Sequence, residues 1–415
     1  MDAREAGLFL LESVLAQHRR LEAALDALPS GDARDRGFAH LIAATVLRRL
    51  GTLDAVLDQH LRGPTPERVR MLLRIGAAQL LFLGTAPHAA VGTAVALAKH
   101  TSEAHGRLVN AVLRRVAATG RERIGDLDTA RLDTPDWLWR SWWGAYGAAT
   151  YDIAAAHAAE PPLDLTPAPG AFPPPDAAVL ANGSWRLPPG TQVTALPGFA
   201  EGTFWVQDAA ASLPARLVGA GPGERVIDLC AAPGGKTLQL VAAGALVTAI
   251  DRDPARLARV GQNLGRLGMQ AETLAADATR WCPAVPVDAV LLDAPCTATG
   301  TIRRHPDVLR LKSARDVAAI VPLQDSLMDA ACAMLRPGGR MVYAVCSLQP
   351  EEGPARIEAA LARLPLRLDP IAEGELAAIP EARTPEGCLR TLPCHWADRG
   401  GMDGFFAARL IRADA

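Results

Sequence analysis

Two cysteines in the second half of the chain each follow an apolar run typical of a buried β-strand. Cys296 lies in the segment Asp293-Ala-Pro-Cys-Thr-Ala-Thr-Gly300, and Cys346 lies in Tyr343-Ala-Val-Cys-Ser347. If both strands belong to one parallel sheet, their carboxyl ends bring the two thiols to the same edge. A single cysteine there is usually a small buried apolar residue, whereas two at equivalent strand ends indicate thiol chemistry.

Methylation of carbon 5 of a cytosine is a reaction that uses two thiols. A thiolate that adds to C6 turns the ring into an enamine whose C5 can attack an activated methyl group, so one difficult step becomes two easier ones. Afterwards the C5 proton must leave and the C6–S bond must break, and a second thiol can assist both events. Asp293 is placed to hydrogen-bond the N3 and amine edge of the base and to protonate N3. Spacing alone does not say which of Cys296 and Cys346 adds to the ring.

The runs that precede these residues alternate with helical stretches. Strand-like segments fall at 226–231, 246–251, 289–294 and 340–345. Buried parallel strands read as continuous apolar runs, and strand–helix alternation is typical of βαβ units. The pattern predicts an α/β doubly wound, Rossmann-like sheet that binds its ligands at the carboxyl ends of the strands.

A glycine turn follows the first predicted strand, in Asp228-Leu-Cys-Ala-Ala-Pro-Gly-Gly-Lys236, and lets backbone N–H groups approach a ligand. It is neither G-x-G-x-x-G nor a Walker A loop, which disfavours a dinucleotide or a triphosphate. Asp251 ends the second strand, where an acid commonly accepts hydrogen bonds from ribose hydroxyls, and Asp277 lies beside the expected adenine. The alternative is that the glycines form only a tight turn and the acids cap helices.

A basic segment, Ile302-Arg-Arg-His-Pro-Asp307, follows the first thiol motif, with Arg310 and Lys312 beyond it. As a phosphate clamp beside the thiols it would supply a local RNA-binding surface. The formal net charge of the whole chain is only −2, so overall charge gives no support for a nucleic-acid partner. The alternative is a solvated charged turn.

The first part of the chain looks entirely helical. Residues 1–125 place apolar side chains at helical spacing and predict a bundle that folds on its own. A Trp-rich helix at 135–147 and proline-rich pieces follow, so we expect a connector and small substrate-binding subdomain over 126–206. The α/β domain then occupies 207–415. The basic residues expected to bind RNA in the helical domain are Arg68, Arg70, Arg74, Arg114, Arg115, Arg121 and Arg123.

The apolar stretches and the cysteines of the chain indicate its cellular compartment. No apolar stretch reaches the ~20 residues of a membrane span, and the N-terminal segment reads as an amphipathic helix rather than a signal peptide. The seven cysteines include no C-x-x-C pair, which favours reduced thiols in a cytoplasmic protein and argues against a disulfide framework. Cys230, Cys282, Cys332, Cys388 and Cys394 have no partners at metal-ligand spacing, so no metal is expected.

These motifs together resemble the RsmB-type RNA cytosine-C5 methyltransferases, also called the Sun or NOL/NOP/Sun family. The likeness rests on DLCAAPGGKT, on DAPC-x-A-T-G-x-I-R-R-H-P-D, on LRPGGRMVY-x-x-CS followed by Pro350-Glu-Glu352, and on the terminal Asp403-Gly-Phe-Phe406. ALPGFAEGTFWVQDAAASL resembles the segment that leads into the family's methyltransferase domain. The blocks are long and specific and cover most of the chain.

The resemblance implies roles that spacing could not assign. Cys346 is the expected nucleophile, Cys296 assists product release, and S-adenosylmethionine is the cofactor. The implied cofactor contacts are Cys230, Ala231, Ala232, Pro233, Gly234, Gly235, Lys236, Asp251, Asp277 and Asp293. The expected RNA contacts around the site are Arg303, Arg304, His305 and Lys236.

The helical N-terminus resembles the RNA-binding antitermination factor NusB, through Pro87-His-Ala-Ala-Val91 and Leu108-Val-Asn-Ala-Val-Leu-Arg-Arg115. A fused domain of this kind implies 16S ribosomal RNA, or a small-subunit assembly intermediate, as the substrate of a monomeric enzyme. Two alternatives stay open: the same chemistry on transfer RNA, and a non-catalytic RNA-binding assembly factor.

The sequence departs from the methyltransferase family's motifs at two places. Val345 stands where the family has Thr, and Leu165-Thr-Pro167 stands where it has Arg-Val-Asn.

Overall fold

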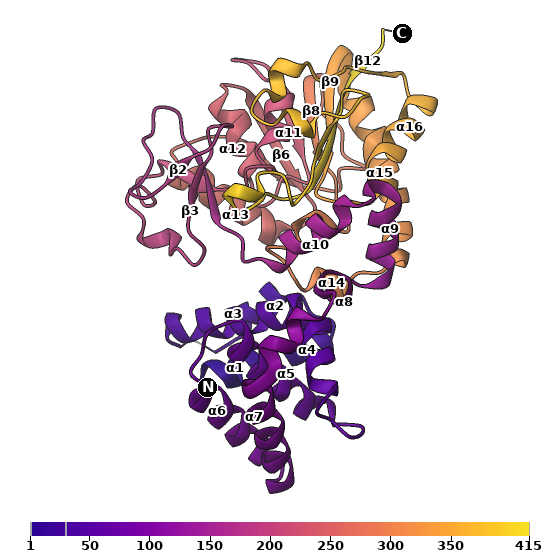
Figure 1. Cartoon of the computed structure of the whole chain (residues 1–415). Helices are drawn as coiled ribbons and strands as arrows, with labels where there is room; N and C mark the ends of the chain where they lie inside the picture. The colour runs from indigo at the N-terminus through magenta and orange to yellow at the C-terminus, as the bar shows by residue number, and fades with distance from the viewer. Residues whose placement is uncertain (1, 30, 415) are drawn as a thin grey trace. The chain divides into compact units, whose positions relative to one another are not determined.

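The computed structural model describes residues 2–29 and 31–414 and divides the chain into two compact units (Figure 1). The helical unit comprises Met1–Ala159 together with Ile302–Ser313, and the sheet unit comprises Glu160–Thr301 and Ala314–Ala415. The boundaries expected after residues 125 and 206 therefore differ from those of the structure. The Trp-rich helix belongs to the helical unit, the small β subdomain belongs to the sheet unit, and a short later segment returns to the helices.

The helical unit confirms the periodicity of the sequence. Its helices are α1 (Ala3–Leu15), α2 (Leu21–Asp26), α3 (Ala33–Arg48), α4 (Leu50–Asp58), α5 (Glu67–Leu81), α6 (Pro87–Lys99), α7 (Glu103–Gly125), α8 (Thr129–Asp133), α9 (Asp136–Tyr146), α10 (Ala149–Ala158) and α14 (Val308–Leu311). Helix α1 begins where the Asp2 carboxylate accepts hydrogen bonds from two backbone N–H groups, as an N-cap residue does. Helix α9 begins after Pro135, which the sequence places at its start.

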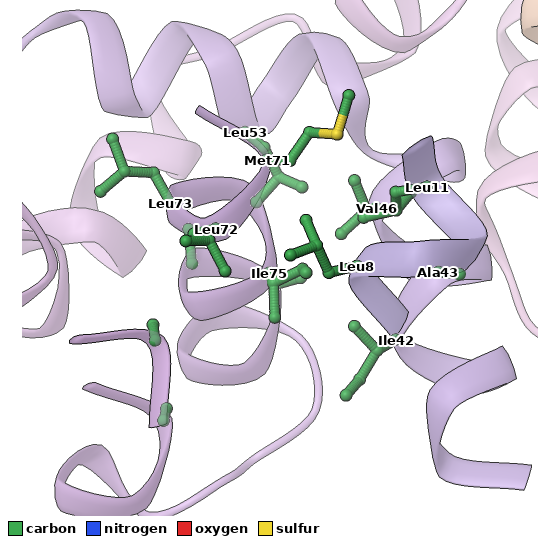
Figure 2. Packing of buried hydrophobic residues seen from close by; sticks show 14 of the residues in the cluster. Leu8, Leu11, Ile42, Ala43, Val46, Leu53, Met71, Leu72, Leu73 and Ile75 are labelled. Atoms are coloured by element: carbon green, nitrogen blue, oxygen red, sulfur yellow. The ribbon is translucent and has the colours of Figure 1, made fainter. Parts of the chain in front are cut away.

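The core of this unit is built from one face of each long helix. Figure 2 shows Leu8 and Leu11 of α1 beside Ile42 of α3 and Leu72 and Ile75 of α5. These side chains recur three or four residues apart and are almost completely buried. Full burial of a Leu or Ile side chain stabilises a fold by about 1.5–3 kcal/mol. Tertiary packing therefore holds these helices together.

The sheet unit confirms the predicted doubly wound sheet. Its strands are β5 (Arg225–Leu229), β6 (Leu246–Asp251), β7 (Glu272–Ala275), β8 (Val287–Asp293), β9 (Leu335–Val345), β10 (Leu366–Leu368), β11 (Leu389–Thr391) and β12 (Phe405–Arg412), in the spatial order β10-β12-β9-β8-β5-β6-β7, with β11 paired to β12. Strands β9, β8, β5, β6 and β7 are parallel, whereas β10 and β11 run antiparallel to β12, and β12 runs antiparallel to β9. The carboxyl ends of the parallel strands consequently meet at one edge.

Helices cover both faces of this sheet. They are α11 (Leu213–Leu217), α12 (Gly235–Ala242), α13 (Pro254–Arg266), α15 (Ala314–Met334) and α16 (Pro354–Arg363). Successive strand residues point to opposite faces. Ile227 accordingly packs in the cluster that contains α15 and α16, whereas Val226 packs in the cluster that contains α11. The short 3-10 helices are η1 (Val193–Ala195), η2 (Thr299–Thr301), η3 (Pro350–Glu352), η4 (Glu373–Leu376), η5 (Pro380–Ala382) and η6 (Ala397–Arg399).

One helix corrects the expectation that no stretch is long and apolar enough for a membrane. By length and composition alone, α15 meets that description among the described residues. Its Leu327, Met328 and Ala331 are buried in the same cluster as Val290 and Leu292 of β8. The packing of α15 against the sheet explains its apolar composition.

The small subdomain is a four-stranded antiparallel sheet of β1 (Leu163–Pro167), β2 (Ala178–Val179), β3 (Trp185–Leu187) and β4 (Phe204–Val206), in the order β2-β3-β1-β4. Leu165, Trp185 and Phe204 form its core. Arg186 on β3 makes a buried ion pair with Asp164 on β1, with Nε and Oδ1 2.6 Å apart. A buried, hydrogen-bonded pair is strongly destabilising to break, so it fixes the register of these short strands.

Candidate active site

The glycine turn lies directly after β5, where the sequence predicts it. Gly234 has φ 106°, a left-handed conformation that favours glycine. A Cβ there would lie 3.1 Å from Val260 Cγ1 and 3.3 Å from Val260 Cα on α13. Helix α12 then begins at Gly235. Glycine therefore serves both the turn and the close approach of the backbone to α13.

Carboxylates follow the strands at this edge as expected. Asp251 at the end of β6 is 3% exposed, and it accepts hydrogen bonds from the N–H groups of Ala232 (3.2 Å) and Asp253 (3.0 Å). Asp277 lies two residues beyond β7 on the surface and accepts from the N–H and hydroxyl of Thr279. The hydrogen bonds from Thr279 lower the pKa of Asp277.

The sequence reasoning missed Asp228, which it quoted only as the first residue of the turn motif. Its side chain is completely buried at the end of β5, and Oδ2 accepts from the Thr237 hydroxyl at 2.6 Å. Oδ1 has no hydrogen-bond partner among the described residues. Burial is the main cause that raises the pKa of Asp228 to about 7. An acid inside an otherwise apolar strand was the signal in the sequence.

Asp228 should make the free energy of unfolding depend on pH. The unfolded chain releases the Asp228 proton near pH 3.8, whereas the folded protein keeps it up to about pH 7. The folded state binds the extra proton in this window, so Asp228 should reduce stability as pH rises, by up to about 1.4 kcal/mol per pH unit. Asp228→Asn, which can still accept from Thr237, should remove this slope in denaturant titrations between pH 5 and pH 7. An unchanged slope would mean that Asp228 is ionised throughout.

Lys236 and Asp293 form a pair beside the turn. Lys236 Nζ donates to Asp293 Oδ2 at 2.8 Å and lies 5.1 Å from the centre of the Phe405 ring. Burial alone would lower the pKa of Lys236, but the Asp293 carboxylate outweighs it and raises this pKa. The side chain of Lys236 is 10% exposed. The site therefore holds a permanent ammonium group against the acid that the sequence assigns to the base.

The two thiols meet at this edge as predicted. Cys296 Sγ and Cys346 Sγ are 3.4 Å apart, and both residues are partly buried. The hydrogen bond to Cys346 and burial raise the pKa of Cys296 well above its usual range, and the Glu352 carboxylate acts in the same direction. Cys346 instead interacts electrostatically with the Lys236 ammonium. The charged groups that interact with the two sulfurs therefore differ in sign, an acid for Cys296 and an ammonium for Cys346.

The basic segment differs from its prediction. Residues 302–313 belong to the helical unit, where the Arg303 carbonyl accepts from Arg48 Nη2 at 2.7 Å. Arg303 is 1% exposed, which does not favour its predicted role as a phosphate contact, whereas Arg304 is exposed and His305 partly exposed. Asp307 explains the placement: its Oδ2 accepts the N–H of Leu21, the first residue of α2, at 3.0 Å. Helix α2 has no side-chain cap from its own N-cap residue, Arg20.

The geometry fits a nucleoside-type cofactor with a cationic end. The turn offers a close backbone approach, Asp251 and Asp277 follow adjacent strands, and Oδ1 of Asp228 is a buried polar atom with no partner among the described residues. A doubly wound sheet with such an edge is typical of a methyltransferase, and the two thiols beside it are compatible with a thiol nucleophile.

Comparisons with known proteins agree with this class. Residues 216–411 match the 16S rRNA methyltransferase RsmB/F family and residues 1–118 match the NusB family. The ribosomal RNA small subunit methyltransferase B of Pseudomonas putida is 37% identical, over 100% of this chain and 99% of that protein. The protein of the same name from Salmonella arizonae is 36% identical, over 97% of this chain and 96% of that protein.

Solved structures support the fold. PH0851 superposes with a TM-score of 0.76 at 21% identity, over 99% of both chains. NSun6 from Pyrococcus horikoshii, crystallised with SFG, gives a TM-score of 0.55 at 18% identity, over 68% of this chain and 99% of that chain. The chain belongs to the 16S rRNA methyltransferase RsmB/F family, and its methyl donor is S-adenosylmethionine. The predicted family, fold and cofactor are confirmed.

Proposed function

We propose that the protein methylates carbon 5 of a cytosine in 16S ribosomal RNA, in the cytoplasm and as a monomer. The observation that carries the proposal is the pair of sulfurs 3.4 Å apart at the carboxyl edge of the sheet, next to the Lys236–Asp293 pair. Relatives that align over the full length and are named as small-subunit ribosomal RNA methyltransferases support the choice of RNA. The substrate is either the free RNA or a small-subunit assembly intermediate.

Each group at the edge has a proposed task. The backbone of 230–236 with Asp251, Asp277 and Asp293 holds S-adenosylmethionine, which supplies an electrophilic methyl group, and Oδ1 of Asp228 is a further polar atom there. The Cys346 thiolate forms a bond to C6 of the cytosine, favoured by the Lys236 ammonium. Asp293 binds the N3 and amine edge and, when protonated, gives its proton to N3 as charge develops and takes it back when the methylated base is released.

Cys296 acts in the second half of the reaction. After methylation, C5 must lose its proton and the bond between C6 and the Cys346 sulfur must break. Cys296 Sγ lies against that sulfur and is held as a neutral thiol by its surroundings. It is placed to protonate the departing sulfur and, once it has become a thiolate, to take up the C5 proton. The two transfers restore the Cys296 thiol and leave Cys346 as a thiol, and ionisation of Cys346 then releases the one proton that the overall methylation produces.

The RNA surface of the helical unit is proposed to lie on α7. Arg70 and Arg74 are paired with Asp54, which removes them from the expected RNA contacts. Arg68 pairs with Glu12. The exposed arginines of α7 form no ion pair among the described residues; they are Arg107, Arg114, Arg115, Arg121 and Arg123. Residues seven apart share a helix face, so Arg107, Arg114 and Arg121 form one basic stripe.

Charge reversal of this stripe should weaken RNA binding. The double variant Arg114→Glu, Arg121→Glu should bind a 16S fragment about tenfold more weakly or worse in moderate salt, and its affinity should depend less steeply on salt. Arg367→Glu on β10, also exposed, is the matched control and should bind normally. Binding should be measured by filter retention across a salt series. Equal losses in both proteins would make the effect one of net charge, and no loss in the double variant would remove α7 from the RNA surface.

Mapping of 5-methylcytosine tests the function itself. Small-subunit RNA from cells that lack this protein should lack one 5-methylcytosine, and the purified protein with S-adenosylmethionine should restore it. Mass spectrometry of nuclease fragments would locate the base. Loss of the modification from transfer RNA instead would favour the same chemistry on that substrate, and no loss from any RNA would favour a non-catalytic assembly factor.

A further inference from the structure

Glu352 at the end of η3 connects the two segments that follow the thiols. Its side chain is completely buried. Oε2 accepts the backbone N–H of Thr297 at 2.8 Å, and Oε1 accepts the hydroxyls of Thr297 and of Ser347, the latter at 2.7 Å. Thr297 directly follows Cys296 and Ser347 directly follows Cys346. One carboxylate therefore binds both thiol segments.

Hydrogen-bond donors surround the Glu352 carboxylate. Gln324 Nε2 on α15 is a fourth donor, 3.1 Å from Oε2. The N–H of Thr297 and Nε2 of Gln324 can only donate, and the two hydroxyls are placed to donate as well. Donors therefore face both carboxylate oxygens. The Glu352 carboxylate raises the pKa of the Cys296 thiol, while the Lys236 ammonium interacts with Cys346.

We propose that Glu352 is a positioning residue that holds the two sulfurs in contact and keeps the proton of the pair on Cys296. The inference deepens the proposed function, because it explains why Cys346 is the thiol that ionises and adds to the base. Thiolate formation on Cys296 is opposed by the Glu352 charge, whereas the charged group that interacts with Cys346 is the Lys236 ammonium. Glu352 itself touches neither the base nor the methyl donor in this scheme.

Three variants separate charge from shape. Glu352→Gln has nearly the same shape: its amide oxygen can still accept from Thr297 N–H and Gln324, and its NH₂ can donate to the two hydroxyls, but the charge is gone. Glu352→Ala removes the connection as well. Glu351→Gln is the matched control, because Glu351 is the adjacent acid and is exposed.

Alkylation by iodoacetamide, followed by tandem mass spectrometry, reports the thiolate content of each cysteine in the full-length protein. At pH 8, Glu352→Gln should alkylate Cys296 about tenfold faster than the wild type, as one unit of pKa would produce. Cys332 and Cys388, both buried, should stay protected, and exposed Cys282 should react equally in all proteins. In methylation assays kcat should fall about tenfold with KM for RNA unchanged, and Glu351→Gln should match the wild type.

Two results would overturn the inference. The first is an unchanged Cys296 rate in Glu352→Gln with Cys332 and Cys388 protected. The second is equal acceleration at Cys296, Cys332 and Cys388, which would make Glu352 a general fold residue. Alkylation needs neither RNA nor methyl transfer, so a failure of the proposed function would leave this readout intact. Glu352→Ala should additionally slow oxidation of Cys296 and Cys346 to a disulfide by diamide, because the sulfurs separate.

Discussion

Replacement of Cys346 by alanine should abolish methyl transfer while leaving the affinity for S-adenosylmethionine within about twofold of the wild type. Removal of a covalent nucleophile typically costs roughly 10⁴-fold or more in turnover. The proposed cofactor contacts lie on other segments, among them the turn 230–236, Asp251 at the end of β6 and Asp277 after β7, so binding should survive. Cys346→Ser should be as inactive, because a hydroxyl does not ionise at neutral pH.

Transfer of labelled methyl groups to RNA and calorimetry with the cofactor measure the two quantities. Cys394→Ala, another partly buried cysteine outside the thiol pair, is the control and should keep full activity. Turnover above a tenth of the wild-type rate in Cys346→Ala would exclude Cys346 as the nucleophile. Loss of cofactor binding in that variant would mean that the substitution damages the fold and decides nothing about chemistry.

Replacement of Cys296 by alanine should have a different and equally large effect, the accumulation of enzyme bonded to its RNA. Addition by Cys346 and methylation should proceed, but the C5 proton and the C6–S bond then lack the thiol that lies 3.4 Å from the departing sulfur. The complex should survive denaturing gel electrophoresis, with most of the protein shifted, and should need S-adenosylmethionine to form in this amount.

The double variant Cys296→Ala, Cys346→Ala is the decisive control, since it should give no shifted band. A trapped complex in Cys346→Ala but not in Cys296→Ala would reverse the two roles. Turnover of Cys296→Ala at the wild-type rate would instead show that water or another group completes the release. Either outcome would contradict the assignment taken from the family resemblance.

Much of the sheet unit could be predicted because each of its buried strands has a pattern that is visible in a short stretch of sequence. Buried parallel strands are continuous apolar runs, so β5, β6, β8 and β9 appear directly in the sequence, each followed by the expected acid, turn or thiol. The positions of Asp251 and Cys346 then follow from where each strand stops. Asp228 escaped notice because a buried acid inside a strand reads like any other residue before a turn.

The segment 302–313 could not be placed from its composition. Arg303, Arg304, Arg310 and Lys312 are basic and suggest a surface loop, but the Asp307 carboxylate caps a helix that begins 286 positions earlier in the chain. The N–H of Leu21 that needs this cap is visible only in three dimensions. The expected contribution of the α5 arginines to RNA binding was overestimated for a similar reason. Asp54 on α4 forms ion pairs with Arg70 and Arg74, and the sequence does not show this contact.

Glu352 shows how distance in the sequence hides a positioning residue. It lies in a recognisable block, Pro350-Glu-Glu352, yet nothing in that block says which glutamate is buried or what it binds. Its donors come from segments 55 and 28 positions away, at Thr297 and Gln324. Only the folded sheet brings the ends of β8 and β9 close enough for one carboxylate to bind both.

The central claim, that Cys346 bonds to the cytosine, is tested most directly by digesting the complex trapped by Cys296→Ala with trypsin and nuclease. Trypsin releases Cys346 on the peptide Met341–Arg356, which contains no other cysteine. Mass spectrometry should find that peptide heavier by one methylated cytidine nucleotide, with fragment ions that locate the added mass on Cys346. A nucleotide on Cys230 or on any other residue, or an unmodified Met341–Arg356 peptide from a trapped complex, would contradict the account.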